Sequence, residues 1–305
     1  MNVDDAYRYC REIAHKHGAN FSVGFRFLPK TKRRAVYAAY AFCRVADDIA
    51  DEEAPVILSR EDGEGPPAER EGGPSSSARL RMTALDDWQR ELDACYAGTP
   101  THPITIALAD ALQHFAIPKS AFLALIDGCR QDMVKTRYET FDELLQYCEL
   151  VAASISDISL SIFGYRTDDA IAYGRNLAVA LQLTNVTRDI GDDLTRDRVY
   201  IPAVELRQFG VEERDLFARA ESDRMKRMIE FQIERARGYF ERAEPLLREL
   251  DFDARFPTLL MGGVYATVLA KLRKDPLIAI RKRLSLSPLQ KVLVVGTRVL
   301  RPHFV

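Results

Sequence analysis

Hydrophobic residues recur at intervals of three and four along most of this chain, which is the spacing of residues on one face of an α-helix. Short alternating runs rich in β-branched and aromatic residues, which are typical of strands, are nearly absent. The pattern predicts helices over 32–53, 104–116, 119–136, 141–163, 168–194, 212–250 and 256–273. We therefore expect an all-α protein.

Three local signals agree with these helices. Pro118 suits the first turn of the helix that starts at 119, because the N–H that proline lacks has no partner there. Thr140 and Glu143 have the spacing of a capping box, in which each side chain accepts a hydrogen bond from the other residue's backbone N–H. Gly164 is placed to end the helix that runs to Phe163.

One segment interrupts the helical pattern. Residues 54–78 read APVILSREDGEGPPAEREGGPSSSA, a composition rich in Gly, Pro, Ser and Glu. Such a segment buries too little apolar surface to offset the conformational entropy that it would lose on ordering. We predict a flexible inserted loop at the surface, and we favour this over the alternative of a lid that takes part in function.

Composition is that of an ordinary globular protein. The chain has 305 residues, of which 47% are hydrophobic and 29% are charged, and its formal net charge is −2. This length suits one large domain or two small ones and allows a deep internal pocket. The small net charge gives no sign of a nucleic-acid partner.

The cysteines and the first residues bear on metals and on location. The five cysteines are scattered, with no Cys-x-x-Cys pair and no histidine cluster, which argues against a zinc site and against a disulfide framework. The first residues, MNVDDAYRYCREIA, are polar and acidic, unlike a signal peptide, and no run of about 18 apolar residues occurs. We expect a cytoplasmic protein.

Polar groups align on one face of the predicted helix 32–53. Asp47 and Asp51 are four residues apart, so their carboxylates leave the same face of a helix one turn apart. Tyr40 and Arg44 continue this stripe toward the N-terminus. Like charges at this spacing repel each other, which suggests that a positive group lies between the carboxylates.

A second stripe of the same kind lies in the predicted helix 168–194. Gln182, Asn185, Asp189 and Asp193 follow one another at offsets of three and four, with Arg188 beside them. A single Asp-x-x-x-Asp pair is weak, because such pairs occur on many solvated helix faces. Two pairs, each in an otherwise apolar helix and each beside an arginine, favour a functional site over two solvated faces.

Magnesium is the cation that suits these stripes. It takes oxygen ligands, keeps several waters, and typically bridges one or two carboxylates to substrate phosphates. Two facing helices of this kind can hold Mg²⁺, or Mn²⁺, around a diphosphate, while Arg44 and Arg188 stabilise the charge of the departing group. The allylic carbocation left behind needs an apolar, water-poor pocket, which a helical bundle supplies.

At these stripes the chain resembles the squalene/phytoene synthase family. The likeness covers nearly the whole chain apart from 54–78, and the two acidic blocks are specific in combination. The similar blocks are NF at 20–21, FLP at 27–29, YAAYAFCRVADDIADE at 37–52, RQDMVKTRYETFDELLQYC at 130–148, LQLTNVTRDIGDDLTRDRVYIP at 181–202, YATVL at 265–269 and the Arg/Ser-rich tail.

The resemblance implies a fold and a reaction. The fold would be a single domain over 1–305, an isoprenoid-synthase helical bundle around a central apolar cavity. The reaction would condense two prenyl diphosphates head to head into a cyclopropylcarbinyl diphosphate, which ionises and rearranges to a linear hydrocarbon or alcohol. No Gly-rich dinucleotide fingerprint is present. Reduction in this family does not need that fingerprint, so the use of NADPH stays open.

The resemblance also implies roles for individual residues. Asp47, Asp51, Asp189 and Asp193 would ligate Mg²⁺. Arg196 and Arg198 precede Tyr200-Ile-Pro, in a segment that tends to close over the site in the family. The residues that would line the diphosphate and cation sites are Tyr40, Arg44, Gln182, Asn185, Arg188 and Tyr265.

Two phenylalanines bear on the length of the substrate. If Phe21 and Phe25 are helical, their rings either plug a tunnel that holds a fifteen-carbon tail or pack as ordinary core aromatics. The blocks at 20–29 and 130–141 look more like bacterial squalene-pathway members than carotenoid ones. We therefore expect farnesyl diphosphate and a thirty-carbon product: squalene, hydroxysqualene or dehydrosqualene. The alternative is a phytoene synthase acting on geranylgeranyl diphosphate.

Other classes are less favoured. A terpene cyclase or chain-elongating synthase has the same fold, and elongating enzymes carry Asp-Asp-x-x-Asp twice. Asp47-Asp48-Ile-Ala-Asp51 comes close to that motif, but the stripe around Asp189 does not fit it. A non-catalytic assembly subunit is the third class, and the intact aspartates argue against it.

Two further segments carry expectations. Where the family usually reads V-A-x-x-V-G, this chain reads VAASIS at 151–156, so Ser156 replaces a glycine at a helix kink near the pocket. This change puts the outcome of the second step in doubt more than the first condensation. The basic and apolar tail 281–305 is either a core helix with a basic edge or a surface that touches anionic membrane.

Overall fold

The structure is a computed structural model that describes residues 1–17, 22–51, 76–287, 290, 293–294, 296 and 303–305. Within these ranges the regular elements are helices, as the hydrophobic spacing predicts. Extended pairing there is limited to two isolated bridges, Arg137 with Val199 and Tyr165 with Leu250. The all-α prediction is therefore confirmed.

The helices differ widely in length, from single turns to more than six turns. The longer helices are α1 (Val3–His17), α3 (Lys30–Ala50), α4 (Ser76–Tyr96), α5 (Pro103–Leu112), α6 (Lys119–Asp132), α7 (Phe141–Cys148), α8 (Ser154–Phe163), α9 (Asp169–Arg188), α13 (Asp223–Ala243) and α15 (Phe252–Lys274). The shorter ones are α2 (Ser22–Phe25), α10 (Ile190–Asp193), α11 (Ala203–Phe209), α12 (Glu213–Phe217), α14 (Leu246–Glu249) and α16 (Ile278–Arg281), with a π-helix η1 (Glu149–Ala153) and a 3₁₀-helix η2 (Leu194–Arg196).

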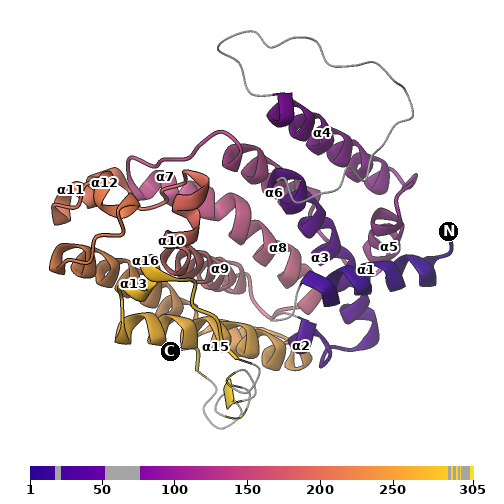
Figure 1. The fold of residues 1–305 in the computed structure, drawn as a ribbon. Coiled ribbons are helices and arrows are strands. Elements are labelled where there is room, and N and C mark those ends of the chain that lie inside the picture. The colour runs from indigo at the N-terminus through magenta and orange to yellow at the C-terminus, as the bar shows by residue number, and fades with distance from the viewer. Residues whose placement is uncertain (18–21, 52–75, 288–289, 291–292, 295, 297–302) are drawn as a thin grey trace.

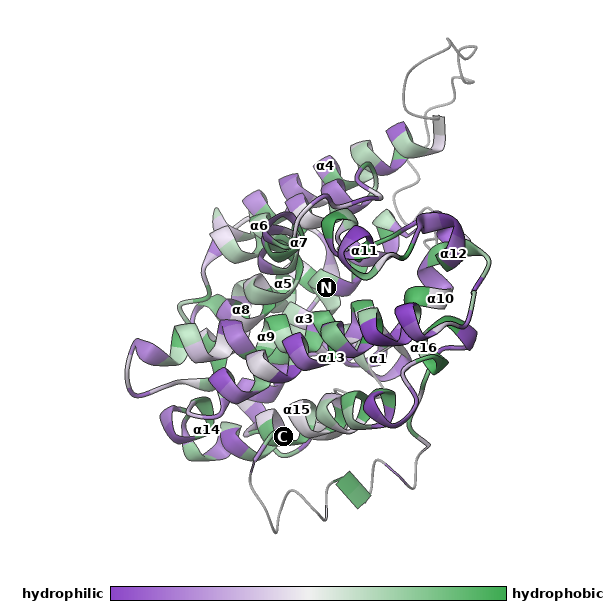
Figure 2. Cartoon of the chain, turned by 90° about the vertical axis from the view of Figure 1, so that its left-hand side faces the viewer, coloured by the Kyte–Doolittle hydropathy of each residue, from purple (hydrophilic) through white to green (hydrophobic). Residues whose placement is uncertain are grey.

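Two helices form the centre of the bundle. α9 packs against α8, α13 and α15, and α3 packs against α1, α5 and α6 (Figure 1). The outer helix α13 shows hydrophobic and hydrophilic turns in alternation, as expected for a helix with one buried face (Figure 2). α4 is fixed to α3 by Trp88, which stacks on Phe42 and donates from Nε1 to the Phe42 carbonyl at 3.2 Å.

The predicted helix 141–163 is interrupted where the family block VAASIS begins. α7 and α8 are joined by η1, a π-turn of the kind that often marks functional sites. Two glycines allow neighbouring helices to approach this junction. A Cβ on Gly128 of α6 would lie 2.5 Å from Val151 Cγ1, and a Cβ on Gly174 of α9 would lie 2.6 Å from Ser156 Oγ.

Other predicted boundaries need correction. The predicted helix 212–250 divides into α12, α13 and α14, because Arg219 has a left-handed φ of 49° and Ser222 caps a new helix. The predicted helix 168–194 breaks at Asp189, the C-cap of α9. α1 and α4 lie outside the predicted runs.

The local signals mostly hold. Pro118 is the N-cap of α6, and Gly164 ends α8 with a φ of 77°. Thr140 Oγ1 accepts from Glu143 N at 3.3 Å. The reciprocal half of the predicted capping box is wrong, because the Glu143 carboxylate instead binds Lys135 Nζ at 2.8 Å.

Two predicted segments fall partly outside the described residues. The predicted loop 54–78 does so up to residue 75, and α4 already begins at Ser76, inside its C-terminal end. In the tail, Phe304 is buried against Gly262 and its N–H donates to Glu244 Oε1 at 2.6 Å. None of the helices in the described ranges is both long enough and apolar enough to span a membrane.

Candidate active site

The described chain encloses a cavity of about 550 Å³ between α3, α6, α8, α9 and α15. Its lining along α3 runs from Val36 through Cys43 to Asp47, and along α9 from Gly174 to Asp189. On both helices the lining is apolar toward the N-terminus and acidic toward the C-terminus. The cavity therefore has an apolar end and an acidic end, about 16 Å apart along α3 at 1.5 Å per residue.

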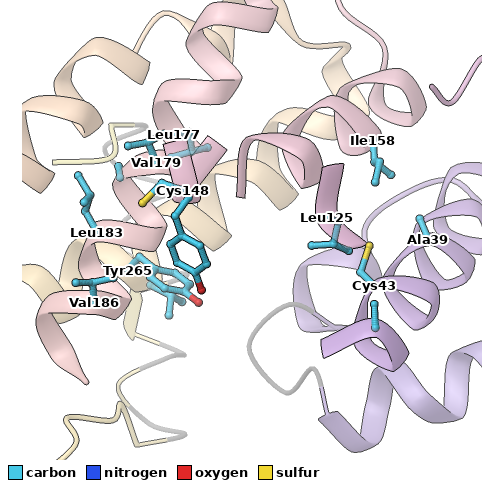
Figure 3. Close-up of a cluster of buried hydrophobic side chains, with 14 of the residues drawn as sticks. Ala39, Cys43, Leu125, Cys148, Ile158, Leu177, Val179, Leu183, Val186 and Tyr265 are labelled. Carbon is cyan, nitrogen blue, oxygen red and sulfur yellow. The ribbon is translucent and has the colours of Figure 1, made fainter. Parts of the chain in front are cut away.

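Apolar side chains from both central helices face this cavity (Figure 3). Ala39 and Cys43 belong to α3 on one side, while Leu177 and Val186 belong to α9 on the other. These side chains make the middle of the cavity largely apolar, which suits a hydrocarbon ligand better than a polar one. The predicted central apolar cavity is thus present.

The stripe on α3 lines the acidic end as predicted. Tyr40, Arg44, Asp47 and Asp51 all border the cavity. Arg44 forms an ion pair with Asp48, which lies one helical turn after it and does not belong to the stripe. Burial raises the pKa of Tyr40 to about 12, so its hydroxyl stays protonated at neutral pH.

Asp47 is half-buried on this stripe, where it borders the cavity. Burial raises the pKa of its carboxyl to about 7, and Asp51 and Asp48 add to the rise against the opposing effect of Arg44. The thiol of Cys129, from α6, lies 3.6 Å from Asp47 Oδ1 and donates to it. The charge of Asp47 is therefore poorly compensated by the protein.

Asp51, the other carboxylate of this stripe, lies beside arginines. Arg198 Nη1 is 3.3 Å from Asp51 Oδ1, and Arg196 Nη1 is 3.6 Å from the same oxygen. Both arginines come from η2 and the segment after it, which turns through a left-handed Asp197 at φ 55°. The structure thus brings Arg196 and Arg198 to the acidic end, while the predicted closing of this segment over the site stays a prediction.

On the α9 stripe the order is reversed: within the described part of the chain, the first carboxylate lies beside arginines, and the second does not have such close partners. Asp189 is held by Arg188, whose Nε lies 2.7 Å from Oδ1, and by Arg283 Nε at 3.2 Å from the same oxygen. Burial raises the pKa of Asp193 to about 7, and Asp189 adds to the rise while Arg198 opposes it. Here the second carboxylate has the poorly compensated charge.

The remaining predicted residues of α9 and α15 meet beside this stripe. Gln182, Asn185 and Tyr265 line the cavity, and Asn185 Nδ2 donates to Gln182 Oε1 at 3.3 Å. Within the described ranges, the buried Asn185 Oδ1 has no hydrogen-bond partner. Burial raises the pKa of Tyr265, against the effect of the nearby Arg188.

A group at the acidic end was missed by the sequence reasoning. Tyr200 OH donates to Asp132 Oδ1 at 2.6 Å, and Arg198 Nη1 lies 3.3 Å from Asp132 Oδ2. The rings of Tyr138 and Tyr147 stack on that of Tyr200, with centroids 5.7 and 5.4 Å away. The resemblance included the blocks that hold these residues, but gave them no role.

The apolar end is formed by α2, α8 and α15. Phe25 lines it and packs edge-on against Tyr37, with ring centroids 6.1 Å apart. That its ring limits the length of the tail stays a prediction. Phe21 lies outside the described residues. Ser156 lines the cavity, in agreement with its predicted place near the pocket.

The acidic end has the donor chemistry that Mg²⁺ prefers. Four carboxylates and the unpaired Asn185 Oδ1 offer oxygen ligands, and the raised pKa values of Asp47 and Asp193 mark negative charge that a cation would relieve. Across the described residues, no three His, Cys, Asp or Glu side chains already converge as a metal cage. The oxygen donors present thus have the chemistry that suits Mg²⁺.

Comparisons with known proteins agree with this geometry. A family model described as squalene/phytoene synthase matches residues 14–290. The 15-cis-phytoene synthase of Synechococcus elongatus is 32% identical to this chain, over 98% of the chain and 94% of that protein. The 15-cis-phytoene synthase of a Synechocystis strain is also 32% identical, over 98% of the chain and 86% of that protein.

Solved structures share the fold. A dehydrosqualene synthase in complex with a ligand superposes with a TM-score of 0.84 at 24% identity, over 99% of this chain and 98% of that one. A squalene synthase from Alicyclobacillus acidocaldarius superposes with a TM-score of 0.76 at 29% identity, over 90% and 95%.

Proposed function

The chain belongs to the squalene/phytoene synthase family, and from this premise we propose that it joins two farnesyl diphosphates into presqualene diphosphate and then a thirty-carbon product. Members of this family are prenyltransferases that condense prenyl diphosphates head to head, and this chain is an enzyme of that class. The observation that carries the proposal is one cavity with an acidic end and an apolar end.

The acidic end suits the diphosphate groups. When bound there, Mg²⁺ would neutralise charge that develops on the departing diphosphate. Asp47, Asp51, Asp189 and Asp193 would hold the ions through their oxygens. Arg198 adds a fixed positive charge at the same place.

Neutral donors beside the aspartates suit the reacting ends of the chains. The hydroxyls of Tyr40 and Tyr265 are protonated at neutral pH, as tyrosine hydroxyls ordinarily are, and burial raises the pKa of both further. Each hydroxyl can therefore donate to a diphosphate oxygen without adding negative charge near the four carboxylates. Arg44 and Arg188, which also line the cavity, would face the leaving group.

The apolar end suits the prenyl tails. Phe25, Leu177 and Met261 line it with apolar side chains that match the hydrocarbon tails. Burial of the tails also excludes water from the reacting carbons. Phe25 would set how far a tail extends toward α2.

Chain length is tested by product analysis. The protein is incubated with Mg²⁺ and radiolabelled farnesyl or geranylgeranyl diphosphate, with and without NADPH. We expect presqualene diphosphate and a thirty-carbon product from the farnesyl substrate. A parent protein that converts neither diphosphate under any of these conditions would contradict the proposal.

A second candidate is phytoene synthesis from geranylgeranyl diphosphate. The observation that favours it is that the curated relatives at 32% identity are phytoene synthases. A forty-carbon product from the parent would establish this candidate and remove the farnesyl assignment.

The variant Phe25→Ala tests whether this ring limits the tail. Removing a partly buried ring leaves a cavity that its surroundings refill only in part, so the preference should move toward geranylgeranyl diphosphate. Phe27→Ala is the matched control, because that ring is 56% exposed and lies outside the cavity lining. An unchanged preference in Phe25→Ala would show that another residue limits the length.

A further inference from the structure

Three phenylalanines form an aromatic patch where α2 meets α15. Phe252, the first residue of α15, is 87% exposed, and Phe27, just after α2, is 56% exposed. Phe256 is half-buried and packs edge-on against Phe27, with ring centroids 4.8 Å apart. Phe252 lies one turn before Phe256 on the same side of α15, next to the Phe27–Phe256 pair. Large aromatic groups gathered on a surface mark a contact with an apolar partner.

The aromatic patch lies on the outer side of the apolar end of the cavity. Phe25, from the same short segment as Phe27, lines the cavity, and so do Thr258 and Met261 of α15. A Cβ on Gly24 would lie 3.4 Å from the Pro257 carbonyl oxygen, so the backbones of α2 and α15 touch here (Figure 1). One layer of helix therefore separates the cavity from the patch.

Basic residues border the aromatic patch. Arg26 and Lys30 are exposed on either side of Phe27, and Arg33 Nη1 donates to the Arg26 carbonyl at 3.1 Å. The nearest acids on α15 are already paired, because Lys32 Nζ lies 3.0 Å from Asp251 and 2.8 Å from Asp253. The surface around the patch therefore carries cations that face solvent.

We propose that the aromatic patch docks this protein on an anionic lipid bilayer. Aromatic rings at a surface insert at the level of the lipid headgroups, and nearby basic side chains are attracted to anionic lipids. Docking would turn the α2–α15 seam toward the bilayer. The seam would then give an oily product a short route into lipid. That last step rests on the proposed function, whereas the docking does not.

Vesicle flotation without substrate or metal tests the docking. The parent protein should float with vesicles of phosphatidylcholine and phosphatidylglycerol, and less with phosphatidylcholine alone. The double variant Phe27→Ser/Phe252→Ser should bind at least about tenfold more weakly, because each ring contributes roughly that factor when buried in an apolar medium. The triple variant Arg26→Gln/Lys30→Gln/Arg33→Gln should lose the preference for the anionic vesicles.

Leu80→Ser is the matched control, since Leu80 is 72% exposed on α4, away from the patch. It should float like the parent, and thermal unfolding checks that each variant is folded. Flotation of the folded double variant equal to that of the parent would overturn the proposal, as would an equal loss in Leu80→Ser. A parent that does not float, but forms a dimer that the double variant loses, would show that the patch binds a second copy instead. Because no turnover is measured, failure here is separate from failure of the proposed function.

Discussion

The two acidic stripes have the same spacing but opposite electrostatic order. On α3 the first carboxylate, Asp47, has a pKa raised to about 7, and the last, Asp51, lies beside arginines. On α9 the first carboxylate, Asp189, is held by arginines, and the last, Asp193, has a pKa raised to about 7. Each stripe therefore combines one compensated and one poorly compensated carboxylate.

This difference shows what spacing on a helix does and does not determine. The 3.6-residue period decides which carboxylates share a face. Burial and groups from other elements decide how well each charge is compensated. Burial raises the pKa of Asp47, and the Cys129 thiol from α6 offsets this only in part. Arg198 reaches Asp51 from the segment after η2. The same motif thus provides both arginine-bound carboxylates and carboxylates with charge left for a cation.

The largest expected loss of turnover comes from the single variants Asp47→Asn and Asp193→Asn. Each removes a proposed metal ligand, so turnover should fall by roughly 10²–10³. The metal-free variants should be as stable as the parent or more stable, because a neutral amide replaces a carboxyl that burial already disfavours when charged. Turnover under Mg²⁺ and thermal unfolding of the metal-free protein check both parts.

Two other variants sharpen this test. Asp51→Asn should also lose turnover, but it should lower stability because it leaves Arg198 with a weaker partner. Asp192→Asn is the control, since Asp192 is exposed and lies off the stripe. A folded Asp47→Asn protein with near-parental turnover would remove the metal assignment.

The next largest loss of turnover is expected from a change at Arg198, which contacts both the α3 stripe and α6. Arg198→Lys replaces a planar fork, which contacts Asp51 and Asp132 together, with a single ammonium. We expect turnover to fall about tenfold to a hundredfold, the range for losing one or two hydrogen bonds between charged groups. Arg207→Lys, at an exposed pair with Glu139, should change nothing in the same assay. Equal losses in both variants would contradict a specific role for Arg198.

The pH dependence of stability tests the raised pKa values directly. In an unfolded chain the pKa of an Asp carboxyl is about 3.9, whereas in the folded protein the pKa of Asp47 and of Asp193 is about 7. Between these values the folded protein binds more protons, so the free energy of unfolding falls as pH rises. This stabilisation is complete below about pH 4 and lost above about pH 7.

Thermal unfolding of the metal-free protein across this pH range measures the slope. The double variant Asp47→Asn/Asp193→Asn should show a flatter profile, because its two sites no longer titrate. A double variant with the parent's slope would refute the raised values. The charged groups that face Asp47, and that stay in both proteins, are Arg44, Asp48 and Asp51, with the neutral Cys129 thiol beside them. Those that face Asp193 are Asp189, Asp132, Arg196 and Arg198.

The smallest effect on the reaction is expected at Ser156, which lies away from both stripes. Ser156→Gly restores the residue that the family usually has, and a glycine inside a helix costs about 1 kcal/mol of stability. The rate of the first condensation should not change, while the ratio of the cyclopropyl diphosphate to the final product should. Ser161→Gly, outside the cavity lining, should show the stability loss alone. A product ratio that is the same in both variants would contradict this.

The sequence was sufficient for features that follow from short-range periodicity. The all-α class, the two stripes and the ends of the helices at Pro118 and Gly164 are of this kind. Phe25 and Tyr265 were found only through the resemblance and the local aromatic pattern. All the predicted site residues in the described ranges line one cavity, while their proposed roles await the experiments above.

Features that depend on contacts between distant elements could not be predicted. Asp132 binds Tyr200 and Arg198, which lie on the segment after η2. No pattern in the sequence around Asp132 indicates these contacts. Close packing at the π-turn η1 and at α8 also involves distant positions: Gly128 of α6 lies against Val151 of η1, and Gly174 of α9 lies against Ser156 of α8. The break at Arg219 needs a left-handed backbone that its own residue type does not indicate.

The contact between Gly174 and Ser156 has a consequence for sequence variation among relatives. A side chain at 174 would collide with Ser156 Oγ at 2.6 Å and with Leu160 Cδ1 at 2.7 Å. A relative with glycine at 156 loses one of these two collisions, and only the flexible end of the leucine then stands in the way. In an alignment we therefore expect the two positions to covary, with larger residues at 174 found mainly where 156 is glycine. The residue at position 156 of α8 would thus limit which residues position 174 of α9, far away in the sequence, can accept.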